Sequence, residues 1–130
     1  MSAAYVDTSF FLAIIFDDPQ ASALCRRLGR YDQRLAGDLL RAEALSAAKR
    51  EGLSLDTLGP ALAAISLVLP ERSLEREMHD VLAYGYLRGA DLWHLACALF
   101  LAEEDRGELV FLSCDTTQRR VARRLGFTTP

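Results

Sequence analysis

The sequence predicts an α/β fold in which a mostly parallel central sheet lies between two layers of helices. Short apolar segments of strand character alternate with longer segments of helical spacing along the whole chain. Parallel strands need long crossover connections, usually helices, so this alternation is typical of a parallel sheet covered on both faces. The chain has 130 residues and no internal repeat, low-complexity tract or linker, so we expect a single domain over residues 1–130.

The first half of the chain is expected to contain two strands and four helices. A strand at residues 3–6 leads into an unusually apolar helix over 8–16, and Asp18-Pro19 is typical of a helix start, so a second helix is expected to run to about residue 28. "LAG" predicts a short strand, Asp38 caps a helix that runs to about residue 51, and a further helix covers about residues 55–64 despite its proline. The third helix has apolar residues at helical spacing, which we expect to face the core: Leu39, Ala42, Leu45 and Ala48.

The second half is expected to contain two clear strands and three helices. "ISLVLP" predicts a buried strand closed by proline, and Ser73 caps a helix that continues to residue 87, before the break at Gly89. "ADLWHLACALFLAEED" is apolar nearly all round, which indicates a central helix. "ELVFLSC" is the clearest strand, "DTTQRRVARRLG" predicts the last helix, and "FTT" is long enough only for the stub of a final strand.

Composition narrows the class of protein. The longest apolar run covers residues 10–16, far short of the roughly 20 residues of a membrane helix, and no leader pattern opens the chain, so we expect a cytoplasmic protein. The net charge of −3 does not by itself indicate nucleic-acid binding. Cys25, Cys97 and Cys114 fit no zinc spacing and are expected to be core thiols.

Acidic residues stand where an open parallel sheet binds ligands, at the carboxyl ends of its strands. Asp7 follows the first strand, Asp115 follows the last clear one, Asp91 begins the central helix, and Glu43 lies in a helix made mainly of Leu and Ala. Each Asp alone is well explained as a helix N-cap worth about 1 kcal/mol, and Glu43 alone as a solvated residue. Two aspartates at one sheet edge, however, need a cation to offset their repulsion.

Four segments resemble, in order, the acidic motifs of PIN domains: "YVDTSFFLAI", "LLRAEALSAAKR", "LRGADLWHLACAL" and "FLSCDTTQRRVARRLGF". More narrowly they resemble the VapC toxin ribonucleases of bacterial and archaeal toxin–antitoxin pairs. The resemblance implies a PIN-like three-layer α/β/α sandwich. It also implies that Asp7, Glu43, Asp91 and Asp115 are the catalytic, metal-binding quartet and that Ser9 and Ser113 support them. The sequence departs from the family by carrying Ser113 where Thr is usual, and by a shortened last strand.

An all-carboxylate site suits Mg²⁺ or Mn²⁺ rather than zinc. The reaction implied is hydrolysis of RNA by metal-activated water, without a covalent intermediate. The alternative is a PIN-like domain that binds RNA or a partner without cleaving. A phospho-accepting receiver domain is disfavoured because the only lysine, Lys49, lies inside a helix, and an aspartyl phosphatase because Ser9 stands where its second Asp belongs.

Other residues are candidates for contacts with partners. The last helix carries arginines that either bind RNA phosphates or only interact favourably with the negative end of the helix dipole: Arg119, Arg120 and Arg123. "FFLAIIF" is apolar on more than one side, so its large side chains are expected to contact either a second copy in a homodimer or an antitoxin: Phe10, Phe11, Ile14 and Ile15. His94 is expected to be a packed, hydrogen-bonded histidine, and Trp93 to fill the core or an interface.

Overall fold

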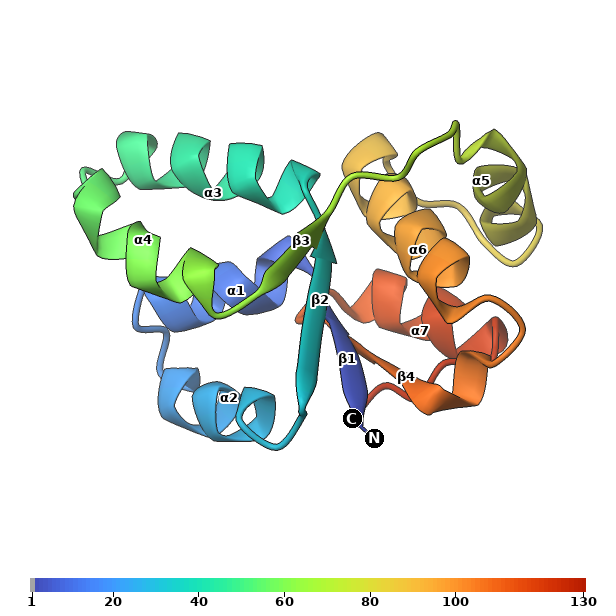
Figure 1. The fold of residues 1–130 in the computed structure, drawn as a ribbon, viewed down its shortest axis with the longest axis horizontal. Coiled ribbons are helices and arrows are strands. Elements are labelled where there is room, and N and C mark those ends of the chain that lie inside the picture. The colour runs from blue at the N-terminus through green and yellow to red at the C-terminus, as the bar shows by residue number, and fades with distance from the viewer. Residues whose placement is uncertain (1) are drawn as a thin grey trace.

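The computed structural model, which describes residues 2–130, has a four-stranded sheet in which all strands are parallel (Figure 1). The strands lie in the order β3-β2-β1-β4, and their bounds are β1 Ala3–Val6, β2 Gln33–Gly37, β3 Ser66–Val68 and β4 Leu109–Leu112. Val110 and Thr128 form an isolated parallel bridge, which is the predicted stub of a final strand. The predicted fold class is confirmed, and the sheet is more uniform than predicted.

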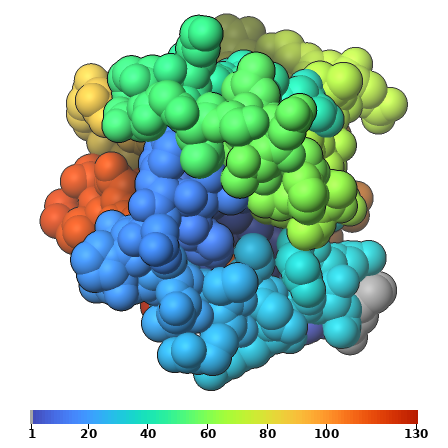
Figure 2. All heavy atoms as spheres, turned by 90° about the vertical axis from the view of Figure 1, so that its left-hand side faces the viewer, coloured from blue at the N-terminus to red at the C-terminus, as the bar shows by residue number. Residues whose placement is uncertain are grey.

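Helices cover both faces of this sheet, four on one side and three on the other (Figure 1). The first layer, seen face on in Figure 2 with α1 recessed among its neighbours, consists of α1 Thr8–Ile15, α2 Ala21–Leu28, α3 Leu39–Arg50 and α4 Leu55–Ala63. The second layer consists of α5 Glu75–Leu82, α6 Gly89–Ala102 and α7 Thr116–Arg124, and a 3₁₀ turn, Arg106–Glu108, precedes β4. No helix among residues 2–130 is long and apolar enough to cross a membrane.

Strand β1 feeds both hydrophobic cores because successive side chains of a strand point to opposite faces. Ala4 and Val6 pack under α1–α4, whereas Tyr5 packs under α5–α7, where its ring stacks on Phe111 of β4 at a centroid distance of 5.6 Å. The central strand is therefore buried on both sides, and the residue that follows it emerges at a fixed place on the sheet edge.

The structure corrects three expectations about helices. The buried side of α3 is Leu40, Ala44, Ala47 and Ala48 instead of the predicted stripe, of which only Ala48 is buried. Both stripes have helical spacing, so spacing alone did not distinguish them. Helix α5 ends at Leu82 rather than residue 87, which leaves residues 83–88 as a connection, and Gly89 begins α6 instead of breaking a helix. Pro60 lies inside α4.

Two further expectations fail on burial. Phe10 and Phe11 are only 1% and 3% exposed and pack in the core under α1–α4, so they form no outer surface for a partner. Ile14 and Ile15 are half-buried, and their expected role in an interface stays a prediction. Among the cysteines, only Cys97 is buried, while Cys25 and Cys114 are exposed.

The sheet has one position at which the chain changes direction across it. From β1 the chain moves through β2 to β3 on one side, whereas β4 lies on the other side of β1. Ligands of open α/β sheets bind at such switch points, outside the carboxyl ends of the strands. Here the switch point lies between β1 and β4, the two strands that Asp7 and Asp115 follow.

Candidate active site

Asp7 occupies the switch point directly. Its backbone N–H donates to the Leu112 carbonyl at 2.9 Å, which ties the end of β1 to the end of β4. Its carboxylate, only 2% exposed, accepts three hydrogen bonds: from the Ser9 N–H at 3.0 Å, the Ser9 hydroxyl at 2.6 Å and the Gln118 amide at 3.0 Å. All three donors are neutral, so Asp7 is held firmly in place while its negative charge is not cancelled.

Asp115 caps α7, as its position before a helix predicts. Its Oδ1 accepts from the Gln118 N–H at 2.8 Å, and its own N–H donates to the Ser113 hydroxyl at 3.0 Å. Ser113, which stands where Thr is usual in the family, thus keeps the hydroxyl that holds the turn before Asp115. The cap also accounts for only one carboxylate oxygen, which leaves the other available to a ligand.

Asp91 lies in the first turn of α6, whose N-cap position is Arg88, so Asp91 itself is not the cap. Its nearest cation is the Arg88 guanidinium, 3.9 Å away and largely exposed. Partial burial, followed by the negative charges of Asp7 and Asp115, raises the pKa of Asp91, and Arg88 offsets this only in part. The three aspartates therefore lie near enough to repel one another.

Gln118 connects the segments that carry these aspartates, and no motif in the sequence pointed to it. The side chain is fully buried; its amide nitrogen donates to Asp7 Oδ1 and, at 3.1 Å, to the Asp91 carbonyl. Its amide oxygen accepts from the Ser113 hydroxyl at 2.6 Å. Both hydrogens and the oxygen of the amide are therefore used, which fixes its orientation. One neutral side chain sets the positions of β1, α6 and the end of β4 relative to one another.

Glu43 lies in the opposite helix layer and joins a chain of hydrogen bonds that is partly buried at Glu43 and fully buried further inside. Its Oε1 accepts from the Thr8 hydroxyl at 2.7 Å and lies 2.6 Å from His94 Nε2. Because a carboxylate only accepts, Nε2 carries the hydrogen; in a neutral ring, Nδ1 then accepts from the Tyr5 hydroxyl at 2.7 Å, which itself accepts from the Gly37 N–H. His94 is thus the packed, hydrogen-bonded histidine that the sequence predicts.

Opposing effects act on the pKa of Glu43. Burial would raise this pKa, but the hydrogen bonds from His94 and Thr8 together outweigh it and lower the pKa. Glu43 is therefore held as an anion, with Oε2 free of these bonds. In the sequence, Glu43 is 35 positions from Thr8 and 51 positions from His94, and Tyr5 acts through His94. No local motif could therefore reveal these partners.

The donor chemistry and the spacing of the acids give different answers about a metal ion. Oxygen-only, anionic ligands held by neutral donors suit a hard divalent cation. Nevertheless, among residues 2–130 no three His, Cys, Asp or Glu side chains lie close enough together to hold one ion as they stand. The four acids therefore have the right type for Mg²⁺ or Mn²⁺, but they do not form a closed cage.

The predicted RNA-binding arginines are partly engaged elsewhere. Arg119 donates to the Pro130 carbonyl at 2.8 Å and Arg123 to the Thr129 carbonyl at 3.4 Å, so both hold the C-terminal segment against α7. Arg120 is exposed. Trp93 is half-buried and lies against Gly37, in agreement with a packing role.

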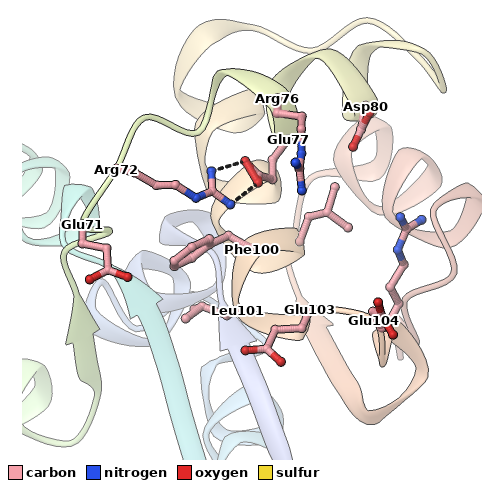
Figure 3. A pocket seen from close by; sticks show the side chains of 11 residues that line it. Glu71, Arg72, Arg76, Glu77, Asp80, Phe100, Leu101, Glu103 and Glu104 are labelled. Atoms are coloured by element: carbon pink, nitrogen blue, oxygen red, sulfur yellow. Dashed lines mark hydrogen bonds and ion pairs between the residues drawn. The ribbon is translucent and has the colours of Figure 1, made fainter.

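A cavity of about 510 Å³ lies away from the four acids, between α5 and the C-terminal part of α6 (Figure 3). Arg72 and Glu77 form a bidentate ion pair there at 2.9 and 2.8 Å, and the Arg72 guanidinium also lies over the Phe100 ring. Its charged groups are of both signs and partly paired with each other, so this cavity has no evident ligand chemistry.

Comparison with known proteins gave one family. The model of the PIN domain family matches residues 4–124, which is nearly the whole chain and includes all four acids. No curated protein matches the sequence.

Proposed function

The chain belongs to the PIN domain family, and on that premise we propose that it is a metal-dependent endoribonuclease with Asp7, Glu43, Asp91 and Asp115 as its active site. PIN domains are generally nucleases and typically use divalent metal ions. The observation that carries the proposal is that Asp7, Asp91 and Asp115 lie near one another at the switch point of the sheet, where their negative charges are only partly offset. Such a cluster of negative charge suits a cation.

The residues of the chain would divide the work. Asp7, Asp91 and Asp115, with Glu43 opposite them, would hold Mg²⁺ or Mn²⁺, which when bound lowers the pKa of water and offsets negative charge on the phosphodiester. Ser9 and Gln118 keep Asp7 in place, and Ser113 shapes the turn before Asp115. His94 and Thr8 keep Glu43 ionised and aim its free oxygen.

We further propose that the enzyme is the toxin of a toxin–antitoxin pair, acting in the cytoplasm as a homodimer. The motif resemblance supports this role. Ile14 and Ile15 of α1 are half-buried, and two clefts beside this helix are both lined by Leu12, so α1 offers some apolar surface on which an antitoxin or a second copy could pack. Expression of the chain alone should then arrest growth, and co-expression of its antitoxin should relieve the arrest.

A domain that binds RNA or a partner without cleaving is the second candidate. The observation that favours it is the lack, among the described residues, of three ligands within reach of one ion. An endonuclease must draw the acids together when the cation and the phosphate arrive, whereas a binding domain need not. Cleavage assays distinguish the two.

The first prediction is that Asp7→Asn and Asp91→Asn each reduce RNA cleavage to background while the fold is kept. The amide preserves size but loses the charge that attracts the cation. Glu43→Gln and Asp115→Asn should also cripple cleavage. The measurement is cleavage of a single-stranded RNA with Mg²⁺ or Mn²⁺, together with far-ultraviolet circular dichroism.

The matched control is Glu77→Gln, which removes a buried charge of another ion pair far from the acids. It should lower stability and leave cleavage intact below its melting temperature. Equal cleavage by the unaltered protein and Asp7→Asn would exclude the proposed site. No cleavage of any RNA by the unaltered, folded protein would favour the binding domain.

A further inference from the structure

A cleft of about 340 Å³ opens beside the proposed active site. Two of the proposed metal ligands line it, together with an aromatic ring and a guanidinium that have no role in binding the cation. Asp91 and Asp115 line the cleft together with four other residues: Tyr86, Leu87, Arg88 and Thr117. We propose that this cleft binds one unpaired nucleotide of the RNA, with its base stacked on Tyr86 and its phosphate beside Arg88. The inference rests on the proposed nuclease function and defines its substrate as single-stranded at the site of cleavage.

Tyr86 is an exposed aromatic residue on a segment whose neighbouring residues are anchored. Its side chain belongs to the connection between α5 and α6, and the residue is 78% exposed. The backbone around it is nevertheless fixed: Leu87 is buried in the core, and Arg124 donates to the Tyr84 carbonyl at 3.1 Å. Gly85 packs against α7 so closely that a Cβ there would lie 2.9 Å from Val121. A backbone anchored in this way keeps Tyr86 beside the cleft, so binding need not first order the segment that carries the ring.

The chemistry of the cleft favours a base and its phosphate. Every nucleobase has a face that stacks on an aromatic ring, so such a platform takes RNA of any sequence, provided the base is unpaired and free of its neighbours. Arg88 has an 81% exposed side chain, and its guanidinium lies 3.9 Å from Asp91. It therefore supplies a cation where a phosphate must approach the acids, and a guanidinium can bind two phosphate oxygens at once.

The chain supplies a matched control for Tyr86. Tyr84 lies two residues earlier in the same connection and is 45% exposed, but it does not line the cleft. Replacing either side chain by Ala removes a similar exposed ring from the same segment. Only the replacement of Tyr86 should affect RNA.

The experiment measures fluorescence anisotropy of a labelled 20-nucleotide single-stranded RNA of mixed sequence, at fixed salt, with Asp7→Asn as the parent so that the RNA stays intact. Tyr86→Ala should weaken binding at least about fivefold, the lower end of what losing one stacked base costs. Tyr86→Phe should bind as the parent does, because the ring is kept, and so should Tyr84→Ala. The same RNA annealed to its complement should bind Tyr86→Ala and the parent equally.

Cleavage by the otherwise unaltered chain gives a second readout. Tyr86→Ala should raise KM and leave kcat nearly unchanged, because stacking is equally strong before and during the reaction. Equal RNA affinities of Tyr86→Ala and the parent, or an equal loss in Tyr84→Ala, would overturn the platform while leaving the nuclease intact. If Asp7→Asn bound no RNA and the unaltered chain also cleaved none, both the proposed function and the stacking site at Tyr86 would be wrong.

Discussion

Asp91 is the one acid of the proposed quartet whose carboxylate accepts no hydrogen bond among the described residues. Asp7, Asp115 and Glu43 each accept hydrogen bonds through their carboxylates, whereas the Asp91 carboxylate has only the distant Arg88 among the described residues. Its pKa is raised above the ordinary value of 3.8, first by burial and then by the neighbouring acids. Folding without a cation must therefore work against this one ionised group.

The second prediction follows from the sign of that shift. A carboxyl with a raised pKa in the folded state binds more protons there than in the unfolded chain, so stability falls as pH rises through the folded pKa. In EDTA, Asp91→Asn should therefore melt higher than the unaltered protein at pH 7, and the gap should close as pH falls toward 4. Thermal melts over this pH range measure it. A variant that melts lower at pH 7, or a gap independent of pH, would contradict the repulsion.

Gln118 carries the third prediction, because its burial leaves no water to replace the bonds it makes. Gln118→Met keeps the approximate size but leaves Asp7 Oδ1 and the Ser113 hydroxyl without this partner. We expect a loss of about 2–4 kcal/mol in the free energy of unfolding, and a further loss of cleavage at temperatures where the variant is folded. Urea unfolding and RNA cleavage measure the two effects.

Glu77→Gln is again the control, since it lowers stability without touching the acids. If Gln118→Met cleaved RNA as well as this control does, Gln118 would be a structural residue without influence on the site.

At the scale of elements, the sequence predicted which aspartates lie at the sheet edge but not which residues hold the acids in place. Asp7 and Asp115 could be placed because each follows an apolar strand and precedes a helix, which are local signals. The hydrogen bonds that Gln118 and His94 make to the acids could not be predicted, because they depend on how α7 and α6 cross the sheet. Helix α3 shows the same limit: its predicted stripe and its buried side both have helical spacing, and which of the two is buried decides the direction of Glu43.

Strand β2 and helix α6 meet so closely that only a glycine fits between them, which gives the fourth prediction. A Cβ on Gly37 would lie 2.2 Å from the Trp93 ring and 3.0 Å from the Tyr5 hydroxyl. Gly37→Ala should therefore cost about 1–3 kcal/mol of stability by overpacking and disturb the chain from Tyr5 through His94 to Glu43. Urea unfolding measures the cost. Adding Trp93→Leu should recover part of it, and a double variant less stable than the sum of the two single changes would contradict the clash.

At the scale of the whole molecule, the proposed site draws on every layer. Asp7 and Asp115 come from the sheet edge, Glu43 from the α1–α4 layer and Asp91 from the α5–α7 layer. No three of these acids lie close enough together to hold one ion as they stand. A cation that all four acids bind would therefore connect both helix layers to the sheet edge, so its binding should be felt as stability of the entire fold.

The fifth prediction concerns this coupling between metal and fold. A cation that binds the folded chain alone stabilises it by RT ln(1 + [L]/Kd), or about 2.7 kcal/mol at a hundredfold excess over Kd. In a domain of this size, that corresponds to a melting temperature higher by several degrees. Mn²⁺ and Mg²⁺ should each produce the rise, and Asp7→Asn should blunt it because it removes one anion from the centre of the cluster.

The comparison that decides is again with Glu77→Gln, which should melt lower in EDTA yet gain as much from Mn²⁺ as the unaltered protein does. That result separates the loss of a metal ligand from a general loss of stability. A melting temperature indifferent to millimolar Mn²⁺, or a gain in Asp7→Asn equal to that of Glu77→Gln, would show that the acids do not bind a cation together. The burial and repulsion that raise the pKa of Asp91 would then destabilise the fold without being relieved by a bound cation.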